Sequence, residues 1–248
     1  MYAVTRTYSG KVVAATVLGL AAASSVYAVP VILNGGFESG FTSWTRANQI
    51  GGDGTFDVQV GTASPSNGDP VPAPPGGVRA AMTDAAGPGS HVLYQDFMVT
   101  AGDANLSFAL FIGNRADRFV TPSLAVGLDF STPALNQQAR VDIIKNTAGQ
   151  FSVAAADVLL NLYQTNPGDP LVSGYNTITT DVTAFLAAHV GETLRVRFAE
   201  TDNVNIFQMG VDNVGFVPTA TVPEPASMLL FGIALATLIG TRSRRKRS

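Results

Sequence analysis

Few side chains in this sequence are suited to catalysis. The 248 residues include no cysteine and two histidines, His91 and His189, and neither has a second metal ligand or a triad partner nearby in the sequence. The absence of cysteine excludes a disulfide framework, a thiolate metal site and a cysteine nucleophile. The sequence also lacks the G-x-S-x-G, H-E-x-x-H, Walker and dinucleotide-binding motifs.

Carboxylates are the more abundant reactive group. Residues 29–222 hold 17 acidic side chains, three of them glutamates. A glycoside hydrolase needs two carboxyl groups about 5–10 Å apart in space, which sequence alone does not reveal. Because nothing in the spacing singles out such a pair, we predict no catalytic residue and no enzyme. A glycoside hydrolase is the least favoured alternative.

The charge distribution argues against nucleic acid as a partner. Residues 29–222 contain 8 basic and 17 acidic residues, a net charge of −9, whereas the whole chain carries −3. Proteins bind DNA and RNA largely by neutralising phosphates, and an acidic domain with scattered arginines does not do this. The basic residues that offset the charge lie mainly at the two ends of the chain.

The N-terminal residues follow the pattern of a secretory signal peptide. Arg6 and Lys11 precede an apolar run from Val12 to Ala23, and small or permissive residues lead up to Ala28. The run is too short to span the roughly 30 Å of hydrocarbon in a bilayer. We therefore predict a signal peptide over residues 1–28, removed by signal peptidase after Ala28.

The C-terminus carries three features in order. The sequence Val-Pro-Glu-Pro at residues 222–225 precedes an apolar segment over residues 226–240, which precedes a basic tail. The basic residues of the tail are Arg242, Arg244, Arg245, Lys246 and Arg247. The apolar segment is shorter than the roughly 20 residues of a membrane-spanning helix, so we expect it to hold the chain in the membrane transiently. The tail is expected to stay on the cytoplasmic side.

This arrangement resembles the PEP-CTERM sorting signal of Gram-negative bacteria over residues 222–248. The resemblance implies that Pro223, Glu224 and Pro225 are recognised by an exosortase, a membrane-embedded transpeptidase-like enzyme that removes the tail. Delivery to the cell surface or the surrounding biofilm matrix would follow. Two prolines keep the backbone extended and free of amide donors, which suits a protease cleft. A permanent single-pass anchor is the alternative.

Residues 29–221 have the pattern of one all-β domain. Short alternating or apolar runs are separated every 8 to 20 residues by Gly, Pro, Asn and Asp, which predicts a β-sandwich. Strands are expected over residues 55–60, 79–82, 91–100, 105–112, 124–130, 140–144, 158–163, 194–200 and 210–217. One short helix is expected over residues 180–191, where an N-cap candidate opens the segment and a glycine ends it.

The same domain carries a second resemblance. The sequence Asn-Gly-Gly-Phe-Glu at residues 34–38, then Trp44, and Gly-Val-Asp-Asn-Val at residues 210–214 are similar to galactose-binding-like jelly rolls, many of which are carbohydrate-binding modules. The resemblance implies a single jelly-roll sandwich with a structural calcium ion held by Glu38 and Asp212. Carboxylate oxygens are ligands that Ca²⁺ prefers. The alternative is that Asp212 only caps a strand turn through side-chain hydrogen bonds.

Sugar binding requires an aromatic platform with amide or carboxylate groups nearby. Trp44 is expected in the core rather than at a binding surface. The loop before the last expected strand combines polar and aromatic side chains, and we predict a carbohydrate-binding rim there. This rim consists of Asn203, Asn205, Phe207 and Gln208. Tyr94, Tyr163 and Tyr175 are alternative platforms.

Taken together, these patterns predict an exported, non-catalytic protein of the cell surface or extracellular matrix, with exopolysaccharide as its expected ligand. A structural or adhesive surface protein that binds no sugar is the main alternative.

Overall fold

The computed structural model describes residues 28–219 except residues 66 and 85. The signal peptide predicted over residues 1–28 therefore lies outside the described residues apart from Ala28, as does the whole sorting signal with its apolar segment and basic tail. Within residues 28–219, no helix is long and apolar enough to cross a membrane.

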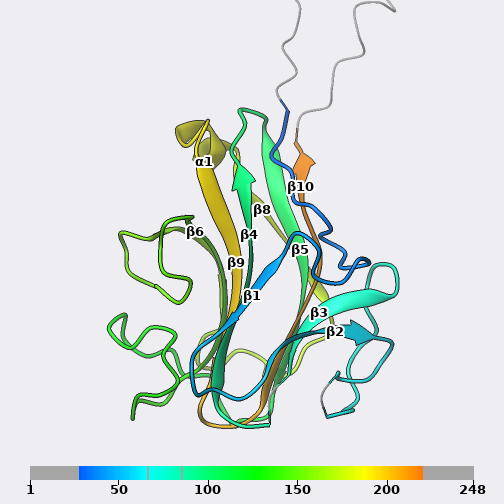
Figure 1. Cartoon of the computed structure of the whole chain (residues 1–248), viewed down its shortest axis with the longest axis vertical. Coiled ribbons are helices and arrows are strands. Elements are labelled where there is room, and N and C mark those ends of the chain that lie inside the picture. The colour runs from blue at the N-terminus through cyan, green and yellow to red at the C-terminus, as the bar shows by residue number, and fades with distance from the viewer. Residues whose placement is uncertain (1–27, 66, 85, 220–248) are drawn as a thin grey trace, which may run out of the picture. The chain divides into compact units, whose positions relative to one another are not determined.

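The described residues form one compact body of strands with a single short helix (Figure 1). In chain order the elements are β1 (Thr45–Asn48), β2 (Thr55–Val60), β3 (Arg79–Asp84), β4 (Gly89–Met98), β5 (Ala104–Asn114), β6 (Gln137–Lys145), β7 (Val158–Gln164), β8 (Asn176–Asp181), α1 (Thr183–Ala188), β9 (Thr193–Asp202) and β10 (Phe207–Pro218).

Two five-stranded antiparallel sheets face each other. Sheet A has the order β1-β4-β9-β6-β7 and sheet B the order β2-β3-β10-β5-β8. If β3 to β10 are renumbered 1 to 8, the order of these strands is 1-8-3-6 in sheet B and 2-7-4-5 in sheet A. This is the strand order of a jelly roll with two Greek keys. The predicted all-β jelly-roll sandwich is therefore confirmed.

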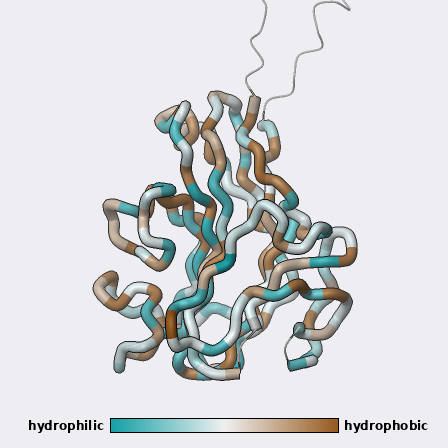
Figure 2. Tube along the Cα trace, viewed as in Figure 1, coloured by the Kyte–Doolittle hydropathy of each residue, from teal (hydrophilic) through white to brown (hydrophobic). Residues whose placement is uncertain are grey.

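The core lies between the sheets and follows from strand alternation. On β9, Leu194, Val196 and Phe198 are buried and point inward, as the period of two requires. Brown apolar segments accordingly alternate with teal and white ones along the strands (Figure 2). Arg195 and Arg197 occupy the opposite face of the same strand.

One expectation about that outer face is wrong. The alternation of β9 predicts that Arg197 faces water, but its side chain is fully buried. The loop after β6 covers it, because the Arg197 guanidinium donates to the carbonyls of Gln150 and Ser152 at 2.8 and 2.7 Å. The same guanidinium forms an ion pair with Asp142 of β6, and Arg140 forms a second ion pair with Asp142. Two arginines therefore surround one buried carboxylate.

The strand expected over residues 124–130 does not form. The amides of Val126 and Gly127 both donate to the carbonyl of Ser123, and Gly127 has a φ of 60°. These bonds turn the chain back on itself, and the apolar side chain of Leu128 is buried on the outer face of sheet A instead of in a sheet. All the other expected strands form.

The expected short helix is confirmed, although it is shorter than residues 180–191. Helix α1 begins at Thr183, and Val182 at its N-cap position makes no side-chain capping bond. Asp181 instead accepts a hydrogen bond from the Thr183 amide at 2.9 Å. Leu186 anchors the helix in the core.

Candidate functional site

The two segments that carry the jelly-roll resemblance meet in space. The amide of Val214 donates to the carbonyl of Gly35 at 2.9 Å, which joins the opening segment to β10. A Cβ on Gly35 would collide with the Val214 carbonyl, so this approach requires glycine. Strand β10 is irregular here, with a register shift between Asp212 and Gly215. Asn213 within it has a φ of 53°.

Glu38 and Asp212 are bridged by the backbone of the loop that leads into β3. The Gly76 amide donates to Asp212 Oδ2 at 3.0 Å, and the Val78 and Arg79 amides donate to Glu38 Oε1 at 2.8 and 3.0 Å. Burial raises the pKa of Asp212 to about 6, the amides oppose this rise, and the charge of Glu38 adds to it. The two carboxylates therefore lie close enough to repel each other.

The donor set at this place suits a hard cation. Glu38 Oε2 accepts no hydrogen bond in the described part of the chain, and the Asn213 side-chain oxygen lies where a Cβ on Gly76 would be. However, residues 28–219 contain no group of three His, Cys, Asp or Glu side chains placed to hold a metal. A cation bound by Glu38 and Asp212 would thus draw its other ligands from backbone and amide oxygens.

The predicted carbohydrate rim does not form as an exposed surface. Phe207 is fully buried in the core, with its ring centroid 5.7 Å from that of Phe119. Gln208 is buried as well and donates to the hydroxyl of Ser64. Both residues belong to β10, on which Phe207 points into the core and Gln208 points to the opposite face, where the segment containing Ser64 covers it, so neither is available for stacking on a sugar.

The two asparagines of the rim hold loops in place. Asn203 donates to the carbonyls of Phe130 and Ala134 and accepts from the Asn136 amide. Asn205 donates to the carbonyl of Arg115 and accepts from the next amide in the chain. A recess of about 170 Å³ lies beside them, lined by residues 86–88 and 202–206, but their amide groups are already engaged.

Trp44 is buried, and the rings of two of the three alternative tyrosines are packed against neighbouring side chains. Trp44 is in the core as expected, 5.1 Å from the ring of Phe37. The guanidinium of Arg195 covers the ring of Tyr94, 4.0 Å from its centroid. The Tyr175 hydroxyl donates to Gln59, and its ring packs against Phe111.

Tyr163 differs from the other tyrosines because it lines a recess of about 140 Å³. The recess opens between the edge strands β7 and β8, where the two sheets are not joined. Its lining consists of Leu110, Ile112, Tyr163, Asp169, Pro170, Ser173, Asn176 and Ile178. Leu110 and Ile112 belong to the main core, so the recess has an apolar floor with a polar edge.

The segment between β7 and β8 shapes this recess. The Ser173 amide donates to the carbonyl of Ile112, and the Asn114 amide donates to the carbonyl of Leu171, each at 2.8 Å. Through these bonds the end of β5 pairs briefly with residues 171–173, and the segment between β7 and β8 is held across the opening of the recess. A turn at residues 167–170 lies in the same segment and brings Asp169 to the edge of the recess.

Several polar groups at this edge have no partner within the described residues. The Tyr163 hydroxyl, the Asn176 side-chain amide and one carboxylate oxygen of Asp169 make no hydrogen bond there, while the other oxygen of Asp169 accepts from the Asn166 amide at 2.7 Å. Burial and the nearby charge of Asp169 raise the pKa of Tyr163. The hydroxyl is therefore protonated at neutral pH and able to donate.

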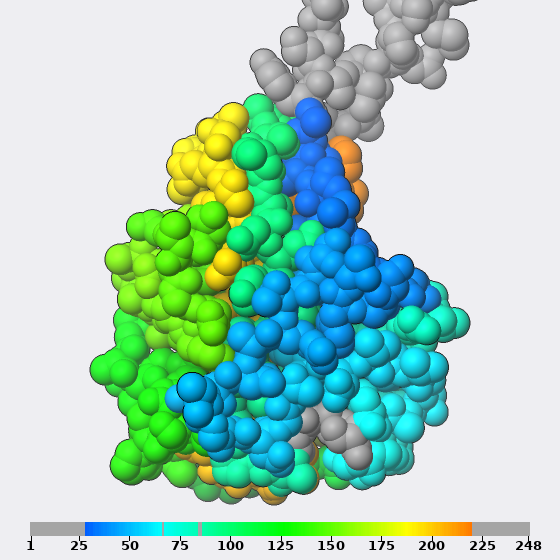
Figure 3. Space-filling view, viewed as in Figure 1, coloured from blue at the N-terminus to red at the C-terminus, as the bar shows by residue number. Residues whose placement is uncertain are grey.

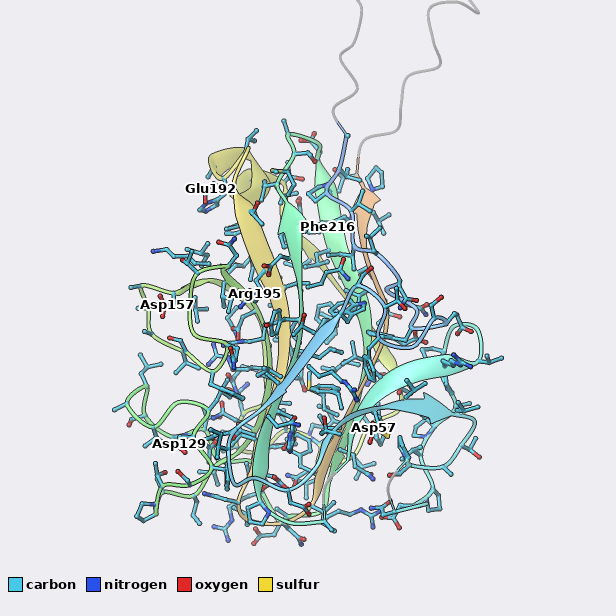
Figure 4. All side chains as sticks on the ribbon, in the orientation of Figure 1. Asp57, Asp129, Asp157, Glu192, Arg195 and Phe216 are labelled. Carbon is cyan, nitrogen blue, oxygen red and sulfur yellow. The ribbon has the colours of Figure 1, made fainter. Side chains whose placement is uncertain are left out.

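A third recess, of about 160 Å³, has fewer free groups. Phe151 lines it together with Gln49, Asp129 and two apolar residues. Gln49 donates to Asp129, and Asp129 also accepts two bonds from Ser131. Figure 4 shows Asp129 on the outer side of the sandwich, below Arg195. The polar side chains that line this third recess mainly stabilise the loop after β5.

Two acidic pairs bear on the hydrolase alternative. Glu200 and Asp202 lie on the same face of β9, but their side chains are only 0% and 1% exposed. In the second pair, Glu38 and Asp212, Asp212 is 0% exposed. A catalytic carboxylate must contact the substrate. Neither pair presents two accessible carboxylates.

Comparisons with known proteins bear on the C-terminus and on the fold. Residues 221–246 match the model of the PEP-CTERM protein-sorting motif, which confirms the resemblance in this region. The motif implies export and exosortase processing at the cell envelope. No protein with a curated description is significantly similar in sequence.

Several solved structures resemble the sandwich at low identity. A CBM61 domain in complex with β-1,4-galactotriose is 11% identical and has a TM-score of 0.42, over 75% of this chain and 97% of that one. The K3 cleaved adhesin domain of Lys-gingipain from Porphyromonas gingivalis is 15% identical with a TM-score of 0.44, over 77% and 98%. A Stig cyclase from Fischerella sp. TAU is 18% identical with a TM-score of 0.42, over 77% and 99%. We draw no functional conclusion from similarities at this level.

Proposed function

We propose that the sandwich is a non-catalytic carbohydrate-binding domain of an exported protein, and that it binds exopolysaccharide through the recess beside Tyr163. The sorting motif over residues 221–246 supports the exported setting, with the cell surface or biofilm matrix as the proposed destination. The single observation that carries the binding proposal is the combination, in one recess, of an aromatic ring, an apolar floor and free polar groups.

The chemistry of this recess suits one sugar ring. A pyranose has an apolar face, which would lie on Tyr163 and the floor made by Leu110 and Ile112. Its hydroxyls would donate to Asp169 and exchange hydrogen bonds with Asn176. At about 140 Å³ the recess is smaller than the roughly 300 Å³ at which pockets for drug-sized ligands begin. It would therefore take a terminal or single residue of a polysaccharide.

A binding role explains the arrangement better than catalysis does. Asp169 is the one carboxylate that lines the recess, whereas glycoside hydrolysis normally uses two. The two histidines are also elsewhere: His91 is buried in β4, and His189 pairs with Glu192 after α1. We therefore assign no catalytic residue.

Calcium is proposed as a structural ion at the junction of the opening segment and β10. Glu38 and Asp212 would bind it through their carboxylates, aided by oxygens of the neighbouring backbone. A divalent cation would relieve the repulsion that contributes to the raised pKa of Asp212. Its role would be to fix this junction, at a distance from the sugar-binding recess.

Affinity electrophoresis of the mature domain tests the binding proposal. Residues 29–222 would be run through gels containing neutral or acidic polysaccharides, including the matrix of the producing strain, with and without calcium. Retardation in one or more gels is expected. A folded domain that migrates freely in all of them would refute sugar binding and favour the structural or adhesive alternative.

A further inference from the structure

Both ends of the described chain are held by one turn. The Gly102 amide donates to the carbonyl of Ala28, and the Thr219 amide donates to the carbonyl of Asp103, each at 3.1 Å. Ala28 is the predicted signal-peptide cleavage point, and Thr219 is the last described residue before the sorting motif. The last residue of the predicted signal peptide and the last described residue before the sorting motif thus bond to adjacent residues of a single turn between β4 and β5.

The same turn also holds the helix. The Gly191 amide donates to the carbonyl of Val99, and the Val99 amide donates to the carbonyl of Glu192. We call this end of the sandwich the terminal face. It comprises the turn at residues 99–103, the connection at residues 189–192, and the side chains of Met98 and Val190. Val217 is not part of it, because Phe97 and Phe216 meet in the core and the residues that follow them, Met98 and Val217, point to opposite outer faces. In the space-filling view, the N-terminal segment lies between the β4–β5 region and the end of β10 (Figure 3).

The terminal face exposes apolar side chains in an acidic setting. Met98 and Val190 are 57% and 52% exposed, although each is a large hydrophobic residue. Asp103 and Glu192 are exposed around them. Glu192 lies at this end in Figure 4. Anionic lipid headgroups would repel these carboxylates. A protein surface with apolar and basic groups is the complementary partner.

The length of chain beyond Thr219 identifies that partner. Only residues 220–222 separate Thr219 from Pro223. Since an extended chain advances at most about 3.6 Å per residue, Glu224 lies no farther than about 18 Å from Thr219. An enzyme that takes the motif into its cleft must therefore approach the terminal face closely.

We propose that the terminal face is a docking surface for the exosortase, which reads the folded end of the sandwich together with the Pro-Glu-Pro motif. Contact with Met98 and Val190 would hold the substrate while the short tether presents Glu224. The recess beside Tyr163 would stay free during this step, because Leu110 lies six positions beyond Ala104 on β5, about 20 Å along the strand. The proposal does not depend on sugar binding.

A processing assay in cells that contain an exosortase tests this surface with the full-length precursor. The double variant Met98→Asp/Val190→Asp places charge on the terminal face. The matched control Ile50→Asp/Leu124→Asp alters two side chains outside it that are 97% and 67% exposed. Conversion of precursor to tail-free product is followed by pulse-chase and immunoblotting. We expect about fivefold slower conversion for the first variant and the wild-type rate for the control.

Two further measurements separate docking from misfolding. Thermal unfolding of the mature domains should give the wild-type Tm for both double variants, because all four side chains are exposed. A photo-crosslinking residue at Met98 should capture the exosortase, whereas the same residue at Ile50 should not. Equal conversion rates for the two double variants, or no crosslink from Met98 beyond that from Ile50, would overturn the proposal.

Discussion

His91 and Glu200 are opposite each other in the pairing of β4 with β9, and both are completely buried. Burial lowers the pKa of His91 to about 4 and raises the pKa of Glu200 well above its ordinary value. Neither carboxyl oxygen of Glu200 has a hydrogen-bond partner in the described part of the chain. Burial therefore favours the uncharged form of both side chains.

Stability is expected to fall as the pH rises above neutral. Burial raises the pKa of Asp202 to about 7, and burial and the charge of Asp202 raise the pKa of Glu200 on the same strand well above its ordinary value. Because both groups bind protons more tightly in the folded state, their contribution is complete below about pH 4 and is lost as the pH rises through the folded pKa values. His91 acts in the opposite direction, but only between about pH 4 and its ordinary pKa of 6.5.

The substitution Glu200→Gln checks this expectation. Glutamine cannot ionise, so the decline in Tm from pH 6 to pH 9 should become shallower than in the wild type. The exposed Glu192→Gln serves as the matched control and should keep the wild-type profile. Identical profiles for all three proteins would show that the burial of Glu200 does not govern alkaline stability.

The buried ion cluster on the outer face of sheet A should matter strongly for stability. Asp142 receives hydrogen bonds from both Arg140 and Arg197. Asp142→Asn would leave two largely buried guanidinium groups without their counter-charge, so we expect a loss of about 3–5 kcal/mol in the free energy of unfolding. Urea denaturation measures it. Asp117→Asn removes an exposed partner of Arg118 and should have no measurable effect.

Sugar affinity should depend on the hydroxyl of Tyr163. Removal of this group by Tyr163→Phe is expected to weaken binding by about 1 kcal/mol, or roughly fivefold, because it takes one hydrogen bond from the recess. Tyr94→Phe is the matched control, since the ring of Tyr94 is covered by Arg195. Asp169→Asn should weaken binding more, because a hydrogen bond to a charged acceptor is stronger. Isothermal titration with an oligosaccharide that retards the domain compares these variants.

Calcium should raise the thermal stability of the mature domain. A ligand at one hundred times its Kd adds about 2.7 kcal/mol to folding. For a domain of this size that corresponds to roughly 5–10 °C in Tm. Differential scanning calorimetry of chelated protein with and without Ca²⁺ measures the shift. Asp212→Asn should abolish it, while Asp57→Asn on β2 should not. An unchanged Tm in the wild type would contradict the calcium proposal.

The sequence was informative where strands are apolar and less so at the sheet edges. Strands β1 and β8 were not anticipated because they are mostly exposed and lack alternating apolar residues. Residues 203–208 looked like a surface loop because of their polar side chains, yet Phe207 begins the most central strand of sheet B. Pairing with β5 decides its burial, and that long-range contact leaves no local signal.

The recess beside Tyr163 could be anticipated only in part. Tyr163 was identifiable as an aromatic platform, and residues 167–170 as a turn. Asp169 and Asn176, however, join the recess because β7 and β8 become the outer edges of different sheets. That relationship depends on the order of all the strands, which no local pattern specifies.

The most direct test of the central claim is an NMR titration of the ¹⁵N-labelled mature domain with an oligosaccharide from the matrix of the producing strain. The account predicts that shift changes concentrate at Tyr163, Asp169, Ser173 and Asn176, next to the floor of the recess. Saturable changes centred on another part of the domain, or no changes at millimolar ligand with a folded domain, would contradict it.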